Sequence, residues 1–270
     1  MAERSKKIIE QICQIQCRSC RVVVFAPHPD DEIIGAFSLL SGADVDRFLV
    51  YVTDGAPLKL GKACAKLKYE RQKESEKVCA LLGIEPDHVF RLGIPDQETT
   101  FQLPSLTRRI DGVLRELNAQ VVLLPAYEGG HPDHDSTAFA VHQIASMLGA
   151  SAPRLLEMSL YHGSEGRMIT GEFLEQLASP EPLLVILSEE DRRLKQEAFA
   201  TYRSQQAVLR CFSTQSERFR FAPSYNFRAP PHPGTLFYER FDWNVTGHQW
   251  RQLASQVLTE SHRVVQVCGY

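Results

Sequence analysis

Two short stretches of the sequence combine histidine, proline and aspartate. The first, HPDDE, covers residues 28–32 and comes just after the apolar run VVVFA. The second, GHPDHD, covers residues 130–135 and comes a few residues after the apolar run VVLLP. Crowded acids repel one another and lose hydration when buried, so a neutralising cation is expected. Histidine and carboxylate without thiolate are typical of a catalytic metal site with three protein ligands and one open position, for which zinc is the leading metal.

The acids also have a simpler interpretation, in which they stabilise helices. Asp30 and Asp31 lie where a strand meets a helix, so one can cap the helix and the other can interact with its dipole. This explains one acid better than two, and the second His-Pro-Asp turn favours the metal site. We interpret Glu32 as a first-turn helix acid and Asp135 as the N-cap of the next helix.

Alternating strands and helices must position these two stretches. Because strand and helix alternate, right-handed crossovers and a mostly parallel sheet are expected, which predicts an α/β fold of the Rossmann-like, doubly wound type. Ligands of such sheets gather at the carboxyl ends of the strands, where both stretches lie. The predicted strands are 22–26, 48–53, 88–92, 121–124, 155–161 and 183–187, and the predicted helices are 32–40, 66–82, 104–117 and 135–148.

The pattern changes after residue 188. One long helix is expected there, then an aromatic and proline-rich stretch (RFRFAPSYNFRAPPHPG), a strand-like TLFYERF at 235–241 and a closing helix. No low-complexity linker or internal repeat separates this part. Residues 1–270 are therefore predicted to form a single domain, with a C-terminal α/β extension at about 207–270 packed on it.

Composition excludes several classes of function. With 270 residues, 43% of them hydrophobic, the chain can bury a full core. A net charge of -3 with interleaved acids and bases is atypical of nucleic-acid binding, and no apolar run approaches the ~20 residues that span a bilayer. Ile8, Ile12 and Ile15 have helical spacing, unlike a signal peptide. We expect a cytoplasmic protein that acts on a small molecule, and the sequence carries no indication of oligomeric state.

The seven cysteines, an odd number, suit a reducing compartment better than a disulfide framework. Cys13, Cys17 and Cys20 have the C-x3-C-x2-C spacing that can hold an iron–sulfur cluster. They precede the first strand, however, whereas such a cluster normally lies in a loop after the first strand of a barrel. We interpret them as packing and surface thiols.

HPDDE and GHPDHD together resemble the PIG-L/LmbE-like family of zinc-dependent deacetylases, which remove acetyl groups from N-acetylglucosamine-type amino sugars. The resemblance continues through TDG at 53–55, ERQKESEKVCALLGI at 70–84, LGIPDQ at 92–97 and KQEAFATYRSQ at 195–205. It covers a family-like core of about residues 20–206. Many family members carry histidine where this chain has Tyr202.

The resemblance implies which residues bind the metal. His28, Asp31 and His134 match the metal ligands. The expected ion is zinc, with iron or another divalent ion as alternatives, and zinc lowers the pKa of a bound water towards ~7.

The resemblance also implies the catalytic residues. Asp30 matches the general base for the water that attacks the amide, His131 matches the residue that supports the oxyanion, and Asp133 orients a histidine. Arg71 and Asp96 are further candidates for contacts with the substrate. Their simpler interpretations are a solvated helix face for Arg71 and a turn cap for Asp96.

The resulting hypothesis is a metal-dependent hydrolase that removes an acetyl group from an N-acetylated amino sugar or glycoside. One alternative is an amidase for a thiol-cofactor conjugate. Another is a protein that binds metal or sugar without catalysis, which Asp30 and His131 argue against because a binder needs neither. A nucleotide-binding module is disfavoured because the turn after the first strand lacks G-x-G-x-x-G.

Overall fold

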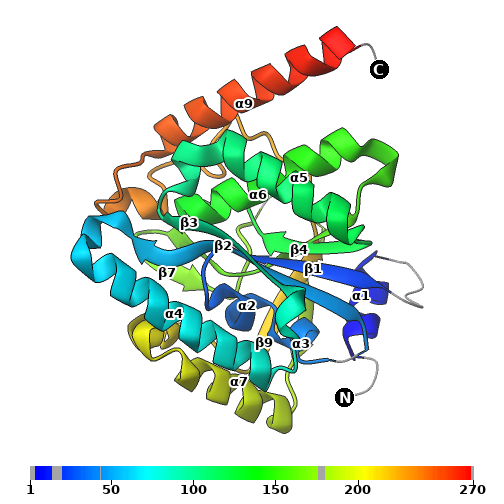
Figure 1. Ribbon diagram of the computed structural model, residues 1–270, viewed down its shortest axis with the longest axis vertical. Coiled ribbons are helices and arrows are strands. Elements are labelled where there is room, and N and C mark those ends of the chain that lie inside the picture. The colour runs from blue at the N-terminus through cyan, green and yellow to red at the C-terminus, as the bar shows by residue number, and fades with distance from the viewer. Residues whose placement is uncertain (1–3, 14–19, 43, 176–179, 269–270) are drawn as a thin grey trace.

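The computed structural model describes residues 4–13, 20–42, 44–175 and 180–268 (Figure 1). Its main feature is one sheet with the strand order β3-β2-β1-β4-β5-β9-β8. The first five strands in this order run parallel, and β9 and β8 add an antiparallel edge. The strands are β1 Arg21–Ala26, β2 Asp46–Pro57, β3 Val89–Asp96, β4 Val121–Pro125, β5 Arg154–Met158, β8 Leu183–Ile186 and β9 Ser216–Phe221.

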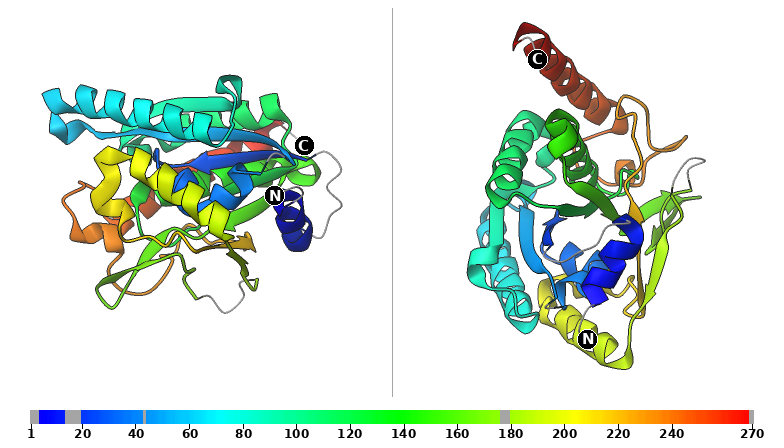
Figure 2. Two further views of the ribbon diagram at one scale, coloured as in Figure 1. Left: turned by 90° about the horizontal axis from the view of Figure 1, so that it is seen from below. Right: turned by 90° about the vertical axis from the view of Figure 1, so that its right-hand side faces the viewer.

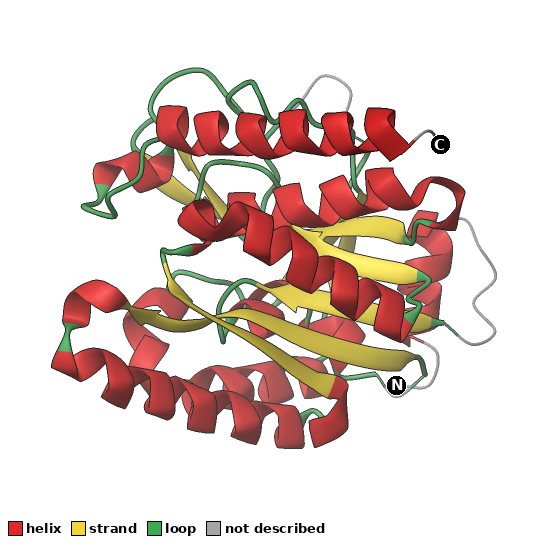
Figure 3. Cartoon of the chain, turned by 45° about the horizontal axis from the view of Figure 1, so that its top comes forward, coloured by secondary structure: helices red, strands yellow, loops and turns green. Residues whose placement is uncertain are grey.

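Helices cover both faces of this sheet (Figures 2 and 3). One face packs against α1 (Arg4–Cys13), α2 (Asp31–Gly35), α3 (Phe37–Leu40), α4 (Lys62–Leu81) and α7 (Glu189–Thr201), and the other against α5 (Leu103–Leu117), α6 (Pro132–Leu148) and α9 (Gly247–Cys268). The remaining elements are α8 (Gln206–Leu209), the hairpin of β6 (Tyr161–Ser164) and β7 (Arg167–Thr170), and the 3-10 turns η1 (Leu58–Leu60), η2 (Pro86–His88), η3 (Thr99–Gln102), η4 (Gly149–Ser151), η5 (Arg203–Gln205) and η6 (Phe237–Arg240). In the described ranges, no helix combines the length and apolar character needed to cross a lipid bilayer.

Strand β1 shows why the early strands read as continuous apolar runs. Val22 and Val24 belong to the core on one face of the sheet, and Val23 and Phe25 belong to the core on the other. A parallel strand that is covered on both faces has no polar side, so its sequence does not alternate. The predicted α/β, doubly wound, mostly parallel sheet is confirmed.

The strand order reverses at β1, because β2 and β3 lie on one side of it and β4 and β5 on the other. β1 and β4 are neighbours, with Val22 opposite Val121 and Val24 opposite Leu123. This is the switch point at which α/β sheets leave a crevice for ligands. Both His-Pro-Asp turns begin there.

The predicted helix over residues 32–40 is wrong in one respect, because it is two short helices, α2 and α3, that meet at Ala36. The chain passes close to the end of β5 here: a Cβ atom added at Gly35 would lie 3.0 Å from the sulfur of Met158. Glu217 then accepts hydrogen bonds from the backbone N–H groups of Phe37 and Ser38, at 2.9 and 2.8 Å. Its carboxylate therefore satisfies the start of α3.

The prediction for the C-terminal part is also wrong in places. The strand-like run at 235–241 contains the turn η6, the predicted strand 155–161 divides into β5 and the start of β6, and β9 was not predicted. β9 has the sequence SERFRF, whose charged residues Glu217 and Arg220 are buried. They pair with Lys195 and Glu157, which come from distant parts of the chain. A hydrophobic pattern cannot reveal a strand whose inward residues are charged.

Of the cysteines at 13, 17 and 20, Cys20 is buried and takes part in a disulfide, so the interpretation as a thiol is wrong there. Cys17 and the side chain of Cys13 lie outside the described residues, as does Ile15 of the N-terminal helical pattern. Ile8 is buried in α1, in agreement with that pattern.

The ion pair of Lys195 and Glu217 generates a prediction about stability. Their Nζ and Oε1 atoms are 2.7 Å apart, and both side chains are fully buried. Glu217→Ala leaves the ammonium and two backbone N–H groups without this acceptor, so we expect the free energy of unfolding to fall by about 3–5 kcal/mol in a denaturant titration. Glu76→Ala breaks an exposed pair with Lys73 and should cost less than about 1 kcal/mol. Equal effects of the two variants would contradict the prediction.

Candidate metal and catalytic site

The two His-Pro-Asp turns meet in a pocket of about 170 Å³ at the carboxyl ends of β1 and β4. The structure brings all but one of the predicted site residues to its lining. Asp133 is the exception, because it lies behind the pocket wall and is fully buried. The predicted residues that line the pocket are His28, Asp30, Asp31, Arg71, Asp96, His131 and His134.

Three donor atoms of this pocket form a compact triangle. His28 Nδ1 lies 3.1 Å from Asp31 Oδ2, and His134 Nε2 lies 3.3 Å from each of these atoms. Ligand atoms bonded at ~2.0–2.1 Å to a tetrahedral zinc ion lie roughly 3.3 Å from one another. The residues that the resemblance implies as ligands therefore have the spacing that a small divalent ion requires.

The other ring nitrogen of His28 faces two more carboxylates. Its Nε2 lies 3.1 Å from Asp96 Oδ1 and 3.1 Å from Asp133 Oδ2. Histidine ligands of metals commonly donate their second N–H to a carboxylate, which fixes the tautomer and the orientation of the ring. The carboxylate of Asp133 is thus placed to orient His28. Asp96 shares this role from the end of β3.

A second group of potential ligands overlaps the first and consists of His28, Asp96, His131 and Asp133, whose donor atoms lie within 4.8 Å of one another. Asp133 is poorly available, since Oδ2 accepts from the N–H of Gln97 at 2.7 Å and Oδ1 accepts from the hydroxyl of Thr99 at 2.5 Å. These bonds tie the loop after β3 to α6. We therefore favour the triangle of His28, Asp31 and His134 as the metal site.

Burial and charge act in opposite directions on the acids of the site. Burial favours the neutral form of Asp31, but His134 and His28 outweigh it and hold the pKa of this carboxyl well below its usual range. Burial lowers the pKa of His28, yet Asp96 and its neighbouring carboxylates raise it well above the ordinary value. Burial raises the pKa of Asp30 to about 8 despite the nearby Arg71. A cation would relieve this excess of negative charge.

Asp30 has a strained backbone, with a φ of 133° that side chains other than glycine rarely adopt. Its N–H donates to Glu32 Oε2 at 2.8 Å, and Arg71 pairs with its carboxylate at 3.1 Å. Arg71 also donates to the carbonyl oxygens of Pro29 and Gly55, at 2.5 and 2.9 Å. Arg71 is buried, so its interpretation as a solvated residue is wrong. It holds Asp30 and its turn in place.

Glu32 is more than a first-turn helix acid, because its side chain is fully buried. Its Oε1 accepts a hydrogen bond from the hydroxyl of Tyr202 at 2.5 Å, and that hydroxyl lies 3.4 Å from the hydroxyl of Tyr51. Burial raises the pKa of Glu32 to about 7. Tyr202 therefore supports the acid that holds the backbone of Asp30.

His131, not Asp135, is the N-cap of α6, so that prediction is wrong. Pro132 occupies the first turn and holds His131 in extended backbone geometry, from which its Nδ1 accepts the N–H of Asp133 at 3.1 Å. Asp135 instead accepts the N–H of Gly129 at 3.0 Å, which holds the preceding loop.

The cap determines the tautomer of His131. Because Nδ1 accepts a hydrogen bond, the proton of the neutral ring lies on Nε2, which is 3.7 Å from Asp96 Oδ1. Burial and the positive charge of His28 lower the pKa of His131 well below its usual value. His131 therefore offers the pocket a neutral N–H donor.

Three aromatic residues of the pocket, Tyr161, Phe212 and Trp243, were not predicted from the sequence. The ring of Tyr161 lies 5.2 Å from that of His134, and the ring of Trp243 lies 4.5 Å from that of His131, measured between centroids. Trp243 belongs to the C-terminal extension. The clustered aromatics of FDW at 241–243 were the only signal in the sequence.

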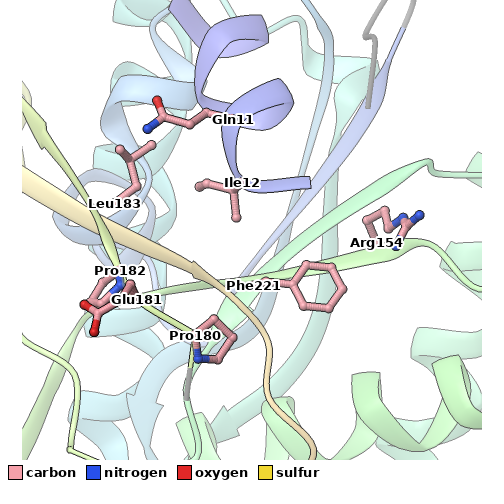
Figure 4. A pocket seen from close by; sticks show the side chains of 8 residues that line it. All are labelled: Gln11, Ile12, Arg154, Pro180, Glu181, Pro182, Leu183 and Phe221. Carbon is pink, nitrogen blue, oxygen red and sulfur yellow. The ribbon is translucent and has the colours of Figure 1, made fainter. Parts of the chain in front are cut away.

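A larger hollow of about 570 Å³ lies elsewhere, beside α1 and the start of β5 (Figure 4). Arg154, which lines it, begins β5, so this hollow is at the amino end of the sheet. Its lining contains Arg154 and Glu181 but no histidine or cysteine among the described residues. Among the described lining residues, Glu181 supplies the single carboxylate, which is too few donors for a metal site.

The chain is similar to proteins of one family. Residues 23–145 match the model of the PIG-L family, described as GlcNAc-PI de-N-acetylase. The chain is 29% identical over 137 residues to the 2'-N-acetylparomamine deacetylase of Streptomyces fradiae, a match that covers 43% of this chain and 49% of the relative. The matched part thus spans about half the length of that curated relative.

Solved structures share the fold. The N,N'-diacetylchitobiose deacetylase of Pyrococcus horikoshii superposes with a TM-score of 0.55 at 20% identity, over 75% of this chain and 84% of that chain. The deacetylase of the A40926 pseudoaglycone superposes with a TM-score of 0.55 at 18% identity, over 77% of this chain and 100% of that chain. At these identities the likeness establishes the α/β fold and no more.

The triangle of donor atoms predicts about one divalent ion per chain. His28→Ala, Asp31→Ala and His134→Ala should each abolish binding, because two remaining donors cannot hold the ion against dialysis. Elemental analysis after loading with zinc measures this, and circular dichroism checks folding.

His88→Ala, which changes a histidine stacked on Phe48, is the matched control and should keep the ion. Asp96→Asn should weaken binding by about 10–100-fold without abolishing it. Full metal content in all three ligand variants would contradict the assignment.

The hydrogen bond between Tyr202 and Glu32 predicts a cost in stability. Tyr202→Phe leaves a buried carboxylate without its hydroxyl donor, so the free energy of unfolding should fall by about 1–3 kcal/mol while the metal content is unchanged. Tyr69→Phe changes an exposed tyrosine and is the control. Identical denaturation midpoints for Tyr202→Phe and the unaltered protein would show that the bond contributes nothing.

Proposed function

We propose that this chain, whose residues 23–145 match the model of the PIG-L family, is a metal-dependent hydrolase that removes an acetyl group from an N-acetylated amino sugar or glycoside. One observation carries the proposal. A triangle of metal donors, a carboxylate outside that triangle and a neutral imidazole donor line one small pocket. Zinc as the ion and the cytoplasm as the compartment are parts of the proposal.

Metal binding and acid–base chemistry are divided between adjacent residues. His28, Asp31 and His134 would hold the ion, which when bound polarises an amide carbonyl and makes water more acidic. Asp30 is not part of the triangle, and its carboxylate is held by Arg71 at 3.1 Å. It can accept the proton of the attacking water and later deliver it to the leaving amine.

Burial raises the pKa of Asp30 to about 8, and Arg71 opposes that rise. A cation held by the adjacent triangle would favour the carboxylate, which is the form that accepts a proton. The strained backbone of Asp30 is maintained by the bond from its N–H to Glu32. Strain of this kind persists only where the surroundings determine the conformation, and it is common at active sites.

His131 would stabilise the oxyanion of the tetrahedral intermediate. Its Nε2 carries the proton because Nδ1 accepts the N–H of Asp133, and its lowered pKa keeps the ring neutral. A donor that is already oriented needs no rearrangement when negative charge develops on the carbonyl oxygen. Asp133 thus serves two histidines, His131 through its backbone and His28 through its carboxylate.

The proposed substrate class rests on the names of similar proteins. Those proteins are named as deacetylases of 2'-N-acetylparomamine, N,N'-diacetylchitobiose and the A40926 pseudoaglycone. The first two names denote N-acetylated amino sugars, and the third denotes an antimicrobial pseudoaglycone. We therefore propose the same chemical class for this chain, and a panel of N-acetylated amino sugars and glycosides with measurement of free amine tests it.

Replacement of the two adjacent aspartates separates base from ligand. Asp30→Asn keeps the shape of the side chain but removes the proton acceptor, so the metal should stay while kcat falls by roughly 10²–10⁴-fold. Asp31→Asn should lose metal, and added zinc should restore part of the activity. His131→Ala should keep its metal and turn over slowly.

The control is the metal content of each variant, measured in the sample used for the assay. The scheme fails if the pattern is reversed, with Asp30→Asn losing metal and recovering with zinc while Asp31→Asn stays loaded but inert.

A further inference from the structure

An aromatic wall stands beside the proposed catalytic groups and has no part in the chemistry described above. Trp243 lines the pocket, and its ring lies 4.5 Å from the ring of His131 at an angle of 47°. The ring of Phe241 stacks on Trp243, with centroids 4.7 Å apart and planes 18° apart. Phe237 contacts Phe241 edge-on at 5.3 Å. The indole of Trp243 therefore contacts the imidazole of His131 and is supported by the ring of Phe241.

This wall is open to solvent, unlike the aromatic residues of the core. Phe241 is 44% exposed, although burial of such a ring would be favourable. Trp243 is half-buried, whereas the other tryptophan, Trp250, is fully buried and donates to Ser136 at 3.0 Å. An exposed aromatic ladder at the mouth of a pocket is typical of a surface that binds a ligand.

The segment that carries the wall is fixed rather than free. The N–H of Trp243 donates to the carbonyl oxygen of Phe241 at 2.9 Å, which closes a tight turn. Lys59 of η1 donates to the carbonyl oxygen of Asp242 at 3.1 Å. The C-terminal extension thereby reaches the carboxyl edge of the sheet, where a rigid aromatic ring costs little entropy when it binds a ligand.

We infer that Trp243, supported by Phe241, is the platform on which the sugar ring of the substrate stacks while the acetamido group enters the pocket beside it. The inference rests on the proposed function and deepens it. A pyranose ring presents C–H groups on one face and hydroxyls at its edge, so it matches an aromatic wall next to carboxylates and imidazoles. A simple acyl chain would need no polar groups around it.

A platform for the sugar ring should affect the binding of two ligands differently. Methyl N-acetylglucosaminide has the ring and the amide, whereas N-acetylethanolamine has the same amide without the ring. An aromatic contact of about 0.5–1.5 kcal/mol, together with the area it buries, corresponds to a change of roughly 10-fold or more in affinity. Trp243→Ala should therefore weaken binding of the glycoside by at least about 10-fold and leave binding of the acyclic amide within about 3-fold.

Calorimetric titration of the zinc-loaded Asp30→Asn protein measures these affinities without turnover. Trp243→Phe in the same background should restore most of the affinity, because a phenyl ring also stacks. Tyr69→Ala removes a 63% exposed aromatic on α4 and should change neither ligand. In the active protein, Trp243→Ala should raise KM for the glycoside by about 10-fold or more and change kcat far less.

The outcomes separate this inference from the proposed function. Tight binding of the glycoside that depends on Trp243, without any release of amine, would support the platform and contradict the hydrolase. Turnover of the glycoside that Trp243→Ala leaves unchanged would overturn the platform and support the hydrolase. Equal losses for the glycoside and the acyclic amide, or no binding of the glycoside at all, would also overturn the platform. If the loss of affinity caused by Trp243→Ala grows with the length of the acyl group, the aromatic wall binds the acyl group instead of the sugar ring.

Discussion

The crowding of buried carboxylates around one imidazole is the constraint on which the site depends. Asp31, Asp96 and Asp133 each place an oxygen 3.1 Å from a ring nitrogen of His28, and Asp30 lies beside them. Each of these carboxylates has a partner that stabilises its negative charge: an arginine, a histidine, or N–H and hydroxyl donors of a neighbouring loop. The positive charge among them is still small for so many buried anions, and a divalent ion is the simplest remedy.

The fold can carry these buried charges with little loss of stability. The parallel strands are covered on both faces, so the sheet is stabilised by its two cores and the carboxyl edge is free to carry polar groups. β9 adds a second set of buried charges, with Glu217 bound to Lys195 and to the start of α3. The same carboxylate thus fixes the short helices that follow HPDDE. The C-terminal extension contributes both this strand and the aromatic wall.

The sequence was sufficient for features that depend on local patterns. The apolar runs predicted the parallel sheet, and the two polar turns predicted a shared site, because each signal lies within a few residues. Features that depend on distant pairs were not predictable. β9 was missed since the partner of Arg220 is Glu157, and the contact between Asp96 and His28 joins residues 68 positions apart. The cap of α6 was misassigned because histidine is an unusual N-cap.

The central claim is that the ion is bound by the triangle of His28, Asp31 and His134 rather than by the neighbouring group that contains Asp96 and His131. Anomalous diffraction from crystals of the zinc-loaded protein tests it most directly. The account predicts one anomalous peak at roughly 2.0–2.1 Å from His28 Nδ1 and His134 Nε2 and near Asp31 Oδ2, with His28 Nε2 still bonded to Asp96 and Asp133. A peak beside His28 Nε2 and His131, with Asp31 unbound, would contradict the account.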